Sequence, residues 1–219
     1  MFVLNGSKDF VKLIGSGIES APEYPIHDTS SHTMQWVFHA FKERRKHCVI
    51  AMHAFSRYCI LFVGVQKQSA AQFFQLFVER LFNEMIFLCD IESHQAKPMV
   101  DFVVTQHRRF IMCQRNDRSV QSHINEVIMD FRYELDEIGQ LPQDNDEMYG
   151  FGCYTNSALR KTARDNDYFR PAERMRDYWL RTFVQISPAA KDKPRHLRLV
   201  EKKNPNNIHF LADYKNPKK

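Results

Sequence analysis

The chain has 219 residues, 43% of them apolar and 26% charged, which is ordinary for a globular protein. Its apolar runs fall far short of the roughly 20 residues that a membrane-crossing helix needs, and no basic stretch leads into an apolar one at the N-terminus, so we expect neither a membrane span nor a secretory signal. Five scattered cysteines without a C-x-x-C pair favour buried free thiols in a reducing compartment, and we expect a cytoplasmic protein.

The formal charge of +5 is concentrated near the C-terminus. From Ser187 onward the chain holds nine Lys or Arg and three Asp or Glu, a net charge of +6. The preceding 186 residues carry 22 basic and 23 acidic side chains, a net charge of −1. We therefore expect a nearly neutral α+β domain over residues 1–186 and a separate basic tail over residues 187–219.

Short runs of β-branched and aromatic residues predict the strands. The first is Met1–Leu4, and Thr33–Phe41, Cys48–Ala54 and Tyr58–Val65 follow with short polar connectors, which favours an antiparallel meander. A further strand is expected at Phe110–Gln114.

Apolar residues at three- and four-residue spacing predict two long amphipathic helices, Ser69–Leu88 and Arg118–Ile138. The polar, acidic stretch Pro142–Met148 is interpreted as a loop, and Pro171 is expected to open a last helix that ends near Phe183. The predicted fold class is α+β, with the antiparallel β-meander packed against the two long helices and a β-hairpin in the C-terminal tail.

The connector between the first two strands of the meander is strongly basic. It contains Arg44, Arg45 and Lys46, and the tail adds Lys202 and Lys203. Clusters of this kind contact the phosphate backbone of nucleic acids, and a solvated turn is the alternative interpretation. These five residues are the candidate nucleic-acid-binding residues.

The second long helix begins with the most informative cluster. Its spacing of about 100 degrees per residue places Arg118, Gln121, Asn125 and Arg132 along one flank of the apolar stripe, with acidic residues on the opposite flank. Guanidinium and amide groups in a row suit a phosphate, a carboxylate or an exposed base edge. A cation in the first turn opposes the helix dipole, and a bound anion would reverse that penalty. The alternative is structural: Arg118 pairs with a carboxylate and Asn125 caps a neighbouring backbone.

Other clusters give weaker signals. His39, His47 and His53 lie on or beside adjacent predicted strands, but they lack the spacing of a helical metal pair, and we expect no metal site. The acidic residues between Glu79 and His94 are interpreted as a solvated face rather than as nuclease carboxylates. Walker loops, nucleophile elbows, dinucleotide fingerprints and kinase motifs are absent from the sequence, which therefore predicts no cofactor and leaves enzymatic activity open.

The segment Arg118-Ser119-Val120, followed by Asn125 after four residues, resembles the R-S-V-L-G-S-M-N segment of an uncharacterised bacterial family, domain of unknown function 6933. Gln121-Ser122-His123-Ile124 replaces the four central residues of that segment. Trp36 before a basic hairpin is similar to the tryptophan of the family, and the resemblance extends over residues 1–183. It implies one domain and adds Trp36 and Ser119 to the candidate ligand-binding residues, but it implies no reaction.

Three classes of function follow from these patterns. A nucleic-acid-associated binding protein of a mobile element or defence cassette is favoured by the basic hairpin, the tail and the Arg/Gln/Asn flank. A protein-interaction module, either a toxin–antitoxin-like partner or a homodimer, would use the tail hairpin to add a strand to another chain. An enzyme acting on a phosphorylated small molecule or RNA would hold phosphate with Arg118 and use a nearby histidine or acidic residue as base.

Overall fold

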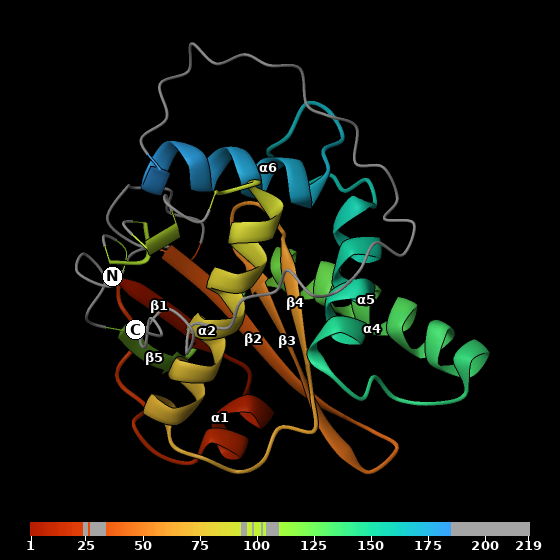
Figure 1. The fold of residues 1–219 in the computed structure, drawn as a ribbon. Coiled ribbons are helices and arrows are strands. Elements are labelled where there is room, and N and C mark those ends of the chain that lie inside the picture. Colours follow the sequence, from red (N-terminus) through yellow and green to blue (C-terminus); the bar gives the residue numbers. More distant parts are fainter. Residues whose placement is uncertain are drawn as a thin grey trace, which may run out of the picture.

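The computed structural model describes residues 1–23, 26, 34–92, 96–97, 99–101, 103 and 110–184. They form a mixed α/β fold in which one five-stranded sheet carries helices on both faces (Figure 1). The strands follow one another across the sheet in the order β4-β3-β2-β1-β5. Their bounds are β1 (Phe2–Gly6), β2 (Met34–Glu43), β3 (Lys46–His53), β4 (Cys59–Val63) and β5 (Phe110–Gln114).

The sheet is part antiparallel and part parallel. β2, β3 and β4 form the antiparallel meander that the sequence predicts, in which Phe38 pairs with Ala51 and Ala51 pairs with Ile60. β1 lies between β2 and β5 and runs parallel to both. All five residues of β1 are buried, as is typical of a parallel strand that is covered on both faces. The predicted mixture of α and β structure is confirmed, in a sheet that is wider than the meander alone.

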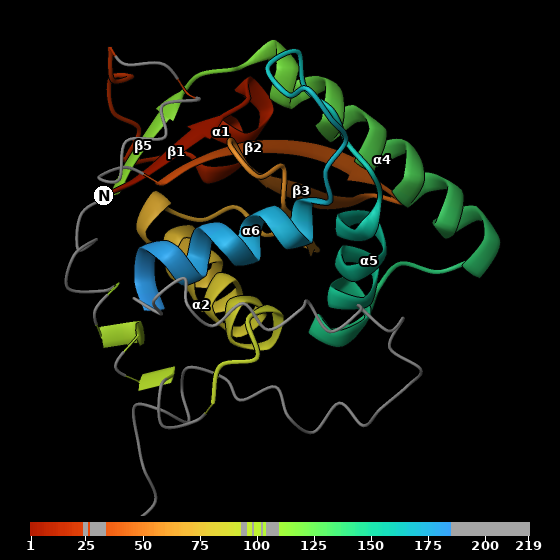
Figure 2. The same ribbon diagram turned by 90° about the horizontal axis from the view of Figure 1, so that it is seen from above.

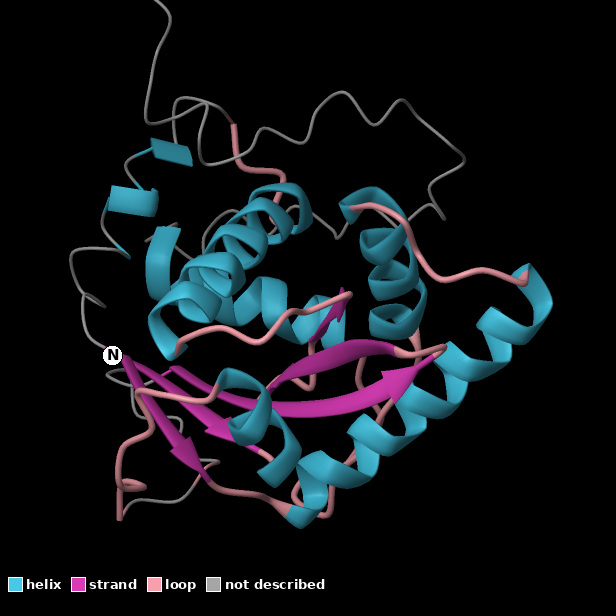
Figure 3. Cartoon of the chain, turned by 90° about the horizontal axis from the view of Figure 1, so that it is seen from below, coloured by secondary structure: helices cyan, strands magenta, loops and turns pink. Residues whose placement is uncertain are grey.

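Helices cover both faces of this sheet. α2 and α6 pack on one face and α4 packs on the other, and α5 stands beside the edge strand β4 (Figure 2, Figure 3). The two segments for which the sequence predicts long amphipathic helices therefore lie on opposite sides of the sheet. The bounds are α1 (Lys8–Ile14), α2 (Ala70–Leu88), α4 (Arg118–Ile138), α5 (Asn145–Ser157) and α6 (Pro171–Trp179), which continues into a π-helical turn, Leu180–Val184.

Each face of the sheet has its own hydrophobic core. Under α2 the core is rich in aromatic rings, and Trp36 and Phe38 of β2 each meet Phe77 edge to face with ring centroids 5.1 Å apart. Under α4 the core is mostly aliphatic and includes Ile124 and Val127. Burial of apolar area at roughly 25 cal/mol per Å² is the main stabilising contribution in both layers.

Side chains define where the long helices begin and end. Asp117 is the N-cap of α4 and accepts a hydrogen bond from the backbone N–H of Val120 at 3.0 Å. Gly139 ends α4 in the left-handed conformation, at a φ of 82°. Ser69 and Gln72 form a capping box at the start of α2. The helices begin at Ala70 and Arg118, within one residue of the beginnings that apolar spacing predicts.

The interpretation of Pro142–Met148 as a loop is wrong in its second half, because α5 begins at Asn145. Asp144 caps this helix by accepting hydrogen bonds from two N–H groups of its first turn, at 3.0 and 2.9 Å. Apolar spacing does not show α5, since Phe151 is the one large apolar side chain among its buried residues.

The expected burial of the cysteines is wrong for one of the five. All are free thiols and four are buried, whereas Cys153 is exposed on α5. None of the helices that the structure describes is long and apolar enough to cross a membrane. The hairpin expected beyond Ser187 lies outside the described residues.

Candidate functional site

The candidate site begins at the turn between β3 and β4, which carries a buried arginine. Arg57 has a left-handed backbone, with a φ of 63°, and its side chain is only 5% exposed. Its N–H donates to the carbonyl of His53 at 2.9 Å, and its guanidinium donates to the carbonyl of Ala54. Nη2 of Arg57 donates to Oγ of Ser119 at 2.9 Å. The turn thus aims a buried cation at the first turn of α4.

The first turn of α4 adds hydrogen-bond donors beside that cation. The side chain of Asp117 accepts from the N–H of Val120, and the Asp117 carbonyl accepts from the N–H of Gln121. The N–H groups of Arg118 and Ser119, the first two of the helix, have no acceptor within an α-helix. The hydroxyl of Ser119 accepts from Arg57 and keeps its own proton free to donate. The helix dipole is positive at the same place.

Charge compensation around Arg57 is incomplete. Within the described part of the chain, no carboxylate oxygen lies within ion-pairing distance of this guanidinium, and its Nε is buried without a hydrogen-bond partner. Burial lowers the pKa of Arg57 to about 10, and the more distant carboxylates of Asp117 and Asp165 offset that effect only in part. Arg174 and Arg164 add to the positive charge. A buried cation of this kind is costly unless an anion joins it.

The loop between α5 and α6 passes over the first turns of α4 and encloses the site on one side (Figure 2). Arg160 and Phe169 exchange backbone hydrogen bonds at 2.8 and 2.9 Å and close this loop at its base. Nη1 of Arg160 also lies 2.6 Å from Oε2 of Glu126 on α4. Asp165 binds Arg174 at 2.8 Å, and the Arg174 guanidinium lies 3.3 Å from the centroid of the Phe169 ring. The loop is therefore held by its own contacts, independently of any ligand.

His123 lies one turn further along α4 and faces the same interior. It is 7% exposed, and its Nδ1 has no partner among the described residues. Burial lowers the pKa of His123, and the nearby charge of Arg57 lowers it further. The ring is therefore neutral at pH 7, and one of its nitrogens is free to accept a proton.

The residues that the sequence singles out on α4 do not all lie at the candidate site. Ser119 belongs to the site, and Arg118 is exposed beside it. The side chains of Gln121 and Asn125 bond to each other at 2.8 Å on the exposed surface. Arg132 pairs with Glu43 of β2 at 3.0 Å. The predicted flank thus exists as an edge that faces β2, and Asn125 and Ser119 lie on different sides of the helix.

The other sequence candidates have structural positions. The interpretation of Trp36 as a ligand-contacting residue is not supported, because its ring is fully buried in the core beneath α2. Arg44 donates from its guanidinium to the carbonyls of Leu135 and Gly139 and so caps the C-terminus of α4. Arg45 and Lys46 are exposed at the tip of the hairpin. Lys202 and Lys203 lie outside the described residues, and the described residues hold no group of three potential metal ligands.

The sequence patterns do not single out Arg57, His123 or Arg160, which the structure places at or beside the candidate site. Two of them are polar residues at positions where the surrounding sequence pattern is apolar. His123 is a polar residue on the apolar stripe of α4, and Arg57 interrupts the apolar strand pair between β3 and β4. A polar side chain at a core position needs a partner, so its burial is more informative than an exposed charge.

The fold and the candidate site define a mixed α/β protein in which a buried arginine, compensated only in part by distant carboxylates, contacts the start of a long helix. The model of the family Domain of unknown function (DUF6933) matches residues 3–174, and the chain belongs to this family. No curated protein and no solved structure is similar enough to give a match. The matched residues include the Arg57 turn, the start of α4 and the loop that covers it.

Proposed function

We propose that this protein binds a phosphate-bearing ligand, and that Arg57, Ser119 and the first turn of α4 hold the phosphate. The observation that carries the proposal is the burial of the Arg57 guanidinium without a carboxylate in contact. A phosphate oxygen at this point would meet a guanidinium, a hydroxyl and two free backbone N–H groups, as anions do at helix N-termini.

Nucleic acid and a free phosphorylated molecule share this chemistry, and α4 offers a way to distinguish them. The basic hairpin tip with Arg45 and Lys46 lies at the far end of α4, because Arg44 caps the C-terminus of that helix. A helix of 21 residues is about 30 Å long. A small ligand reaches only the Arg57 end, whereas a polynucleotide is able to contact both ends. We favour the polynucleotide, since the tip and the exposed Arg118 supply further cations along the same helix.

The test compares two ligands and three variants of the full chain. Arg57→Lys keeps the charge but loses the planar set of donors, so it should weaken binding of inorganic phosphate and of a single-stranded oligonucleotide by at least about tenfold in calorimetric titrations. Arg45→Ala should weaken only the oligonucleotide. Arg181→Lys, at an exposed position in the π-helical turn, is the matched control and should leave both affinities unchanged. Equal affinities in Arg57→Lys and the unaltered chain would remove Arg57 from the ligand site.

His123 favours a second candidate, an enzyme that acts on the phosphorylated ligand. Its ring is neutral, buried and within the electrostatic reach of Arg57, which suits a general base beside a bound phosphate. His123→Gln should then abolish turnover of a phosphoester probe while phosphate affinity is retained. Absence of turnover by the unaltered chain would leave binding alone as the function. The interaction-module alternative rests on the tail, which lies outside the described residues.

A further inference from the structure

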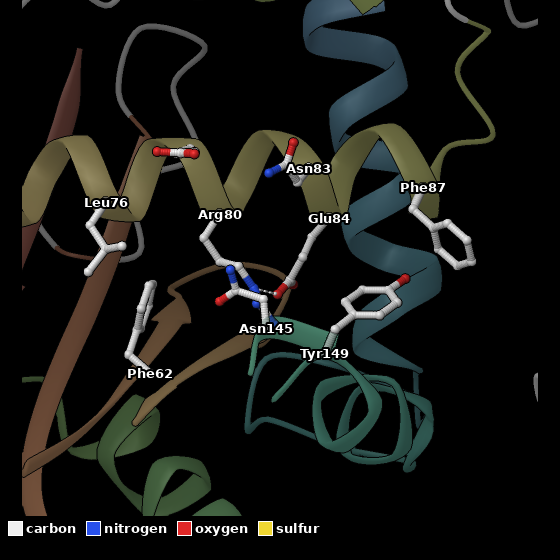
Figure 4. Close-up of a pocket in the computed structure, with 9 residues that line it drawn as sticks. Phe62, Leu76, Arg80, Asn83, Glu84, Phe87, Asn145 and Tyr149 are labelled. Carbon is white, nitrogen blue, oxygen red and sulfur yellow. Dashed lines mark hydrogen bonds and ion pairs between the residues drawn. The ribbon is translucent and has the colours of Figure 1, made fainter. Parts of the chain in front are cut away.

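Cavities lie on two sides of α5, and they differ in how their charges are paired. The first lies between α2 and α5 and contains a buried ion pair, in which Nε of Arg80 lies 2.7 Å from Oε1 of Glu84 (Figure 4). The hydroxyl of Tyr58 donates to the other carboxylate oxygen of Glu84 at 2.8 Å. The expectation that the acidic residues between Glu79 and His94 form a solvated face is therefore wrong for Glu84, which is 3% exposed and has its cationic partner within the fold.

The second cavity has a volume of about 230 Å³ and lies between the end of α4 and the first turns of α5. Its buried lining is apolar, and Phe131 and Phe151 meet there edge to face with ring centroids 5.3 Å apart. Ile138 and Gly150 are exposed, so the cavity opens to solvent beside them. The lining residues are Phe131, Glu134, Leu135, Ile138, Gln140, Pro142, Glu147, Gly150 and Phe151. The cavity thus has an apolar interior and a solvent-facing opening.

The charged residues of this second lining are both acidic. Within the described part of the chain, no basic side chain lies within ion-pairing distance of Glu134 or Glu147. Burial raises the pKa of Glu134, and the charge of Glu137 raises it further. The guanidinium of Arg44 reaches this end of α4, but it donates to backbone carbonyls of the helix. The cavity therefore carries negative charge that no contact with a described cation neutralises.

Glu134 is also placed unfavourably on its helix. The last turn of α4 adds the carboxylates of Asp136 and Glu137, and all three oppose the helix dipole, which is negative at the C-terminus. Glu147, in contrast, lies in the first turn of α5, where the dipole favours it, and it accepts a hydrogen bond from the N–H of Gln143 at 2.7 Å. A cation beside Glu134 would turn an unfavourable interaction into a favourable one.

We propose that this cavity binds a small organic cation. Its apolar body lies against Phe131, Leu135 and Phe151, and its ammonium group pairs with Glu134, supported by the charge of Glu147 at the opening. A cavity of roughly 150 Å³ is enough for benzene, so this one has room for a body of about six carbon atoms. The phosphate site is at the other end of α4, which is about 30 Å long, so the two sites are separate.

Hexylamine, hexanol and hexanoate are suitable probes for the full chain, because they share a six-carbon body and differ in the head group. Ligand-detected NMR titrations at pH 7 should show saturable binding of hexylamine, about tenfold tighter than that of hexanol, and no binding of hexanoate. A lysine capped at both ends presents an ammonium stem on a peptide backbone. It should bind more weakly than hexylamine, because its backbone does not enter the cavity.

Two variants separate the charge of the cavity from its space. Glu134→Gln keeps the shape and should weaken hexylamine at least about fivefold while hexanol is unaffected. Gly150→Leu fills the cavity and should weaken both at least about tenfold. A Cβ at Gly150 meets no atom within 4 Å and leucine favours a helix, so this variant should fold. Asp136→Asn, exposed on the other side of α4, is the matched control and should change neither affinity by more than about twofold.

The proposal fails if hexylamine shows no saturable binding, or if hexanol or hexanoate binds as tightly as hexylamine. Unchanged hexylamine affinity in both Glu134→Gln and Gly150→Leu would place the binding elsewhere. Tighter binding of the capped lysine than of hexylamine would overturn the assignment of a free small molecule, in favour of a lysine side chain of a polypeptide. Glu134→Gln keeps the test decisive if Gly150→Leu does not fold.

Discussion

Arg57 combines three unfavourable features in one residue. A left-handed backbone costs a side chain other than glycine about 1 kcal/mol or more, a buried guanidinium loses its hydration, and no described carboxylate contacts it. Arg80 is buried to a similar degree but has Glu84 as a direct partner. The two arginines therefore differ in what stabilises them, and their removal should reduce the stability of the fold to very different extents.

Replacing each of these arginines with methionine tests that difference. Arg57→Met should change the free energy of unfolding by less than about 1 kcal/mol, because the costs of burying an unpaired cation disappear with it. Arg80→Met should cost about 3–5 kcal/mol at pH 7, because Glu84 is left buried without its partner. Urea unfolding measures both. A loss as large for Arg57→Met as for Arg80→Met would show that Arg57 is structural and not a ligand-binding residue.

His53 should make the fold sensitive to acid. Its ring is buried between Trp36 and Tyr178, its Nδ1 lies 2.9 Å from Oγ of Ser56, and burial together with the charge of Arg57 lowers its pKa to about 3. The unfolded chain takes up this proton near pH 6.5 and the folded chain does not, so stability is lost as the pH falls from 6.5 toward 3.

The loss from this one histidine should be about 1.4 kcal/mol between pH 7.5 and 5.5. Between pH 7.5 and 5.5 the free energy of unfolding of His53→Gln should therefore fall by about 1.4 kcal/mol less than that of the unaltered chain. Urea unfolding at the two pH values measures both losses. A residual slope is expected in the variant, because burial also lowers the pKa of His39 and of His123. The same pH dependence in the variant and the unaltered chain would contradict this assignment.

At the scale of elements, the β2–β3 hairpin and α4 support each other. The hairpin tip has positive φ values of 44° at Arg44 and 67° at Arg45, as two-residue hairpin turns require. Arg44 then reaches the last carbonyls of α4, where a cation is favourable to the helix dipole. From the sequence both arginines are nucleic-acid candidates, since no local pattern encodes the contact between hairpin and helix.

Glycine substitutions separate the two arginines of the tip. Both Arg44→Gly and Arg45→Gly relieve the positive φ, but only Arg44→Gly removes the cap on α4. Arg44→Gly should be less stable than Arg45→Gly by about 0.3–1 kcal/mol, and the difference should shrink in high salt. Thermal melts of the two variants provide the comparison. Equal stability would mean that the guanidinium contact does not contribute.

At the scale of the whole molecule, the sequence predicts what repeats regularly and misses what depends on distant contacts. The apolar spacing of α2 and α4 and the alternation in the meander are local signals, and the structure has these elements. The parallel insertion of β1 between β2 and β5 joins segments about a hundred residues apart, which spacing does not reveal. The same holds for the candidate site: Ser119 lies in the segment that the sequence singles out, whereas Arg57, which donates a hydrogen bond to it, is 62 residues away in the chain.

The division of the chain into a domain and a tail stays a prediction, and the two cores favour it. Both cores are assembled from described residues between Phe2 and Phe183. A chain that ends at Ile186 should therefore unfold cooperatively, with a melting temperature close to that of the full chain. Calorimetry of both chains provides the measurement, and broad or absent unfolding of the shorter chain would show that the tail completes the fold.

The Arg57 Nε–H resonance in a proton–nitrogen NMR spectrum tests the central proposal most directly, because this donor is buried and without a partner among the described residues. The spectrum of Arg57→Lys identifies the resonance by its disappearance. Titration with inorganic phosphate should shift this signal and the backbone N–H signal of Ser119 together, in a saturable manner and more than those of exposed arginines such as Arg181. An Arg57 signal that does not move while exposed arginines respond would contradict a phosphate site at the start of α4.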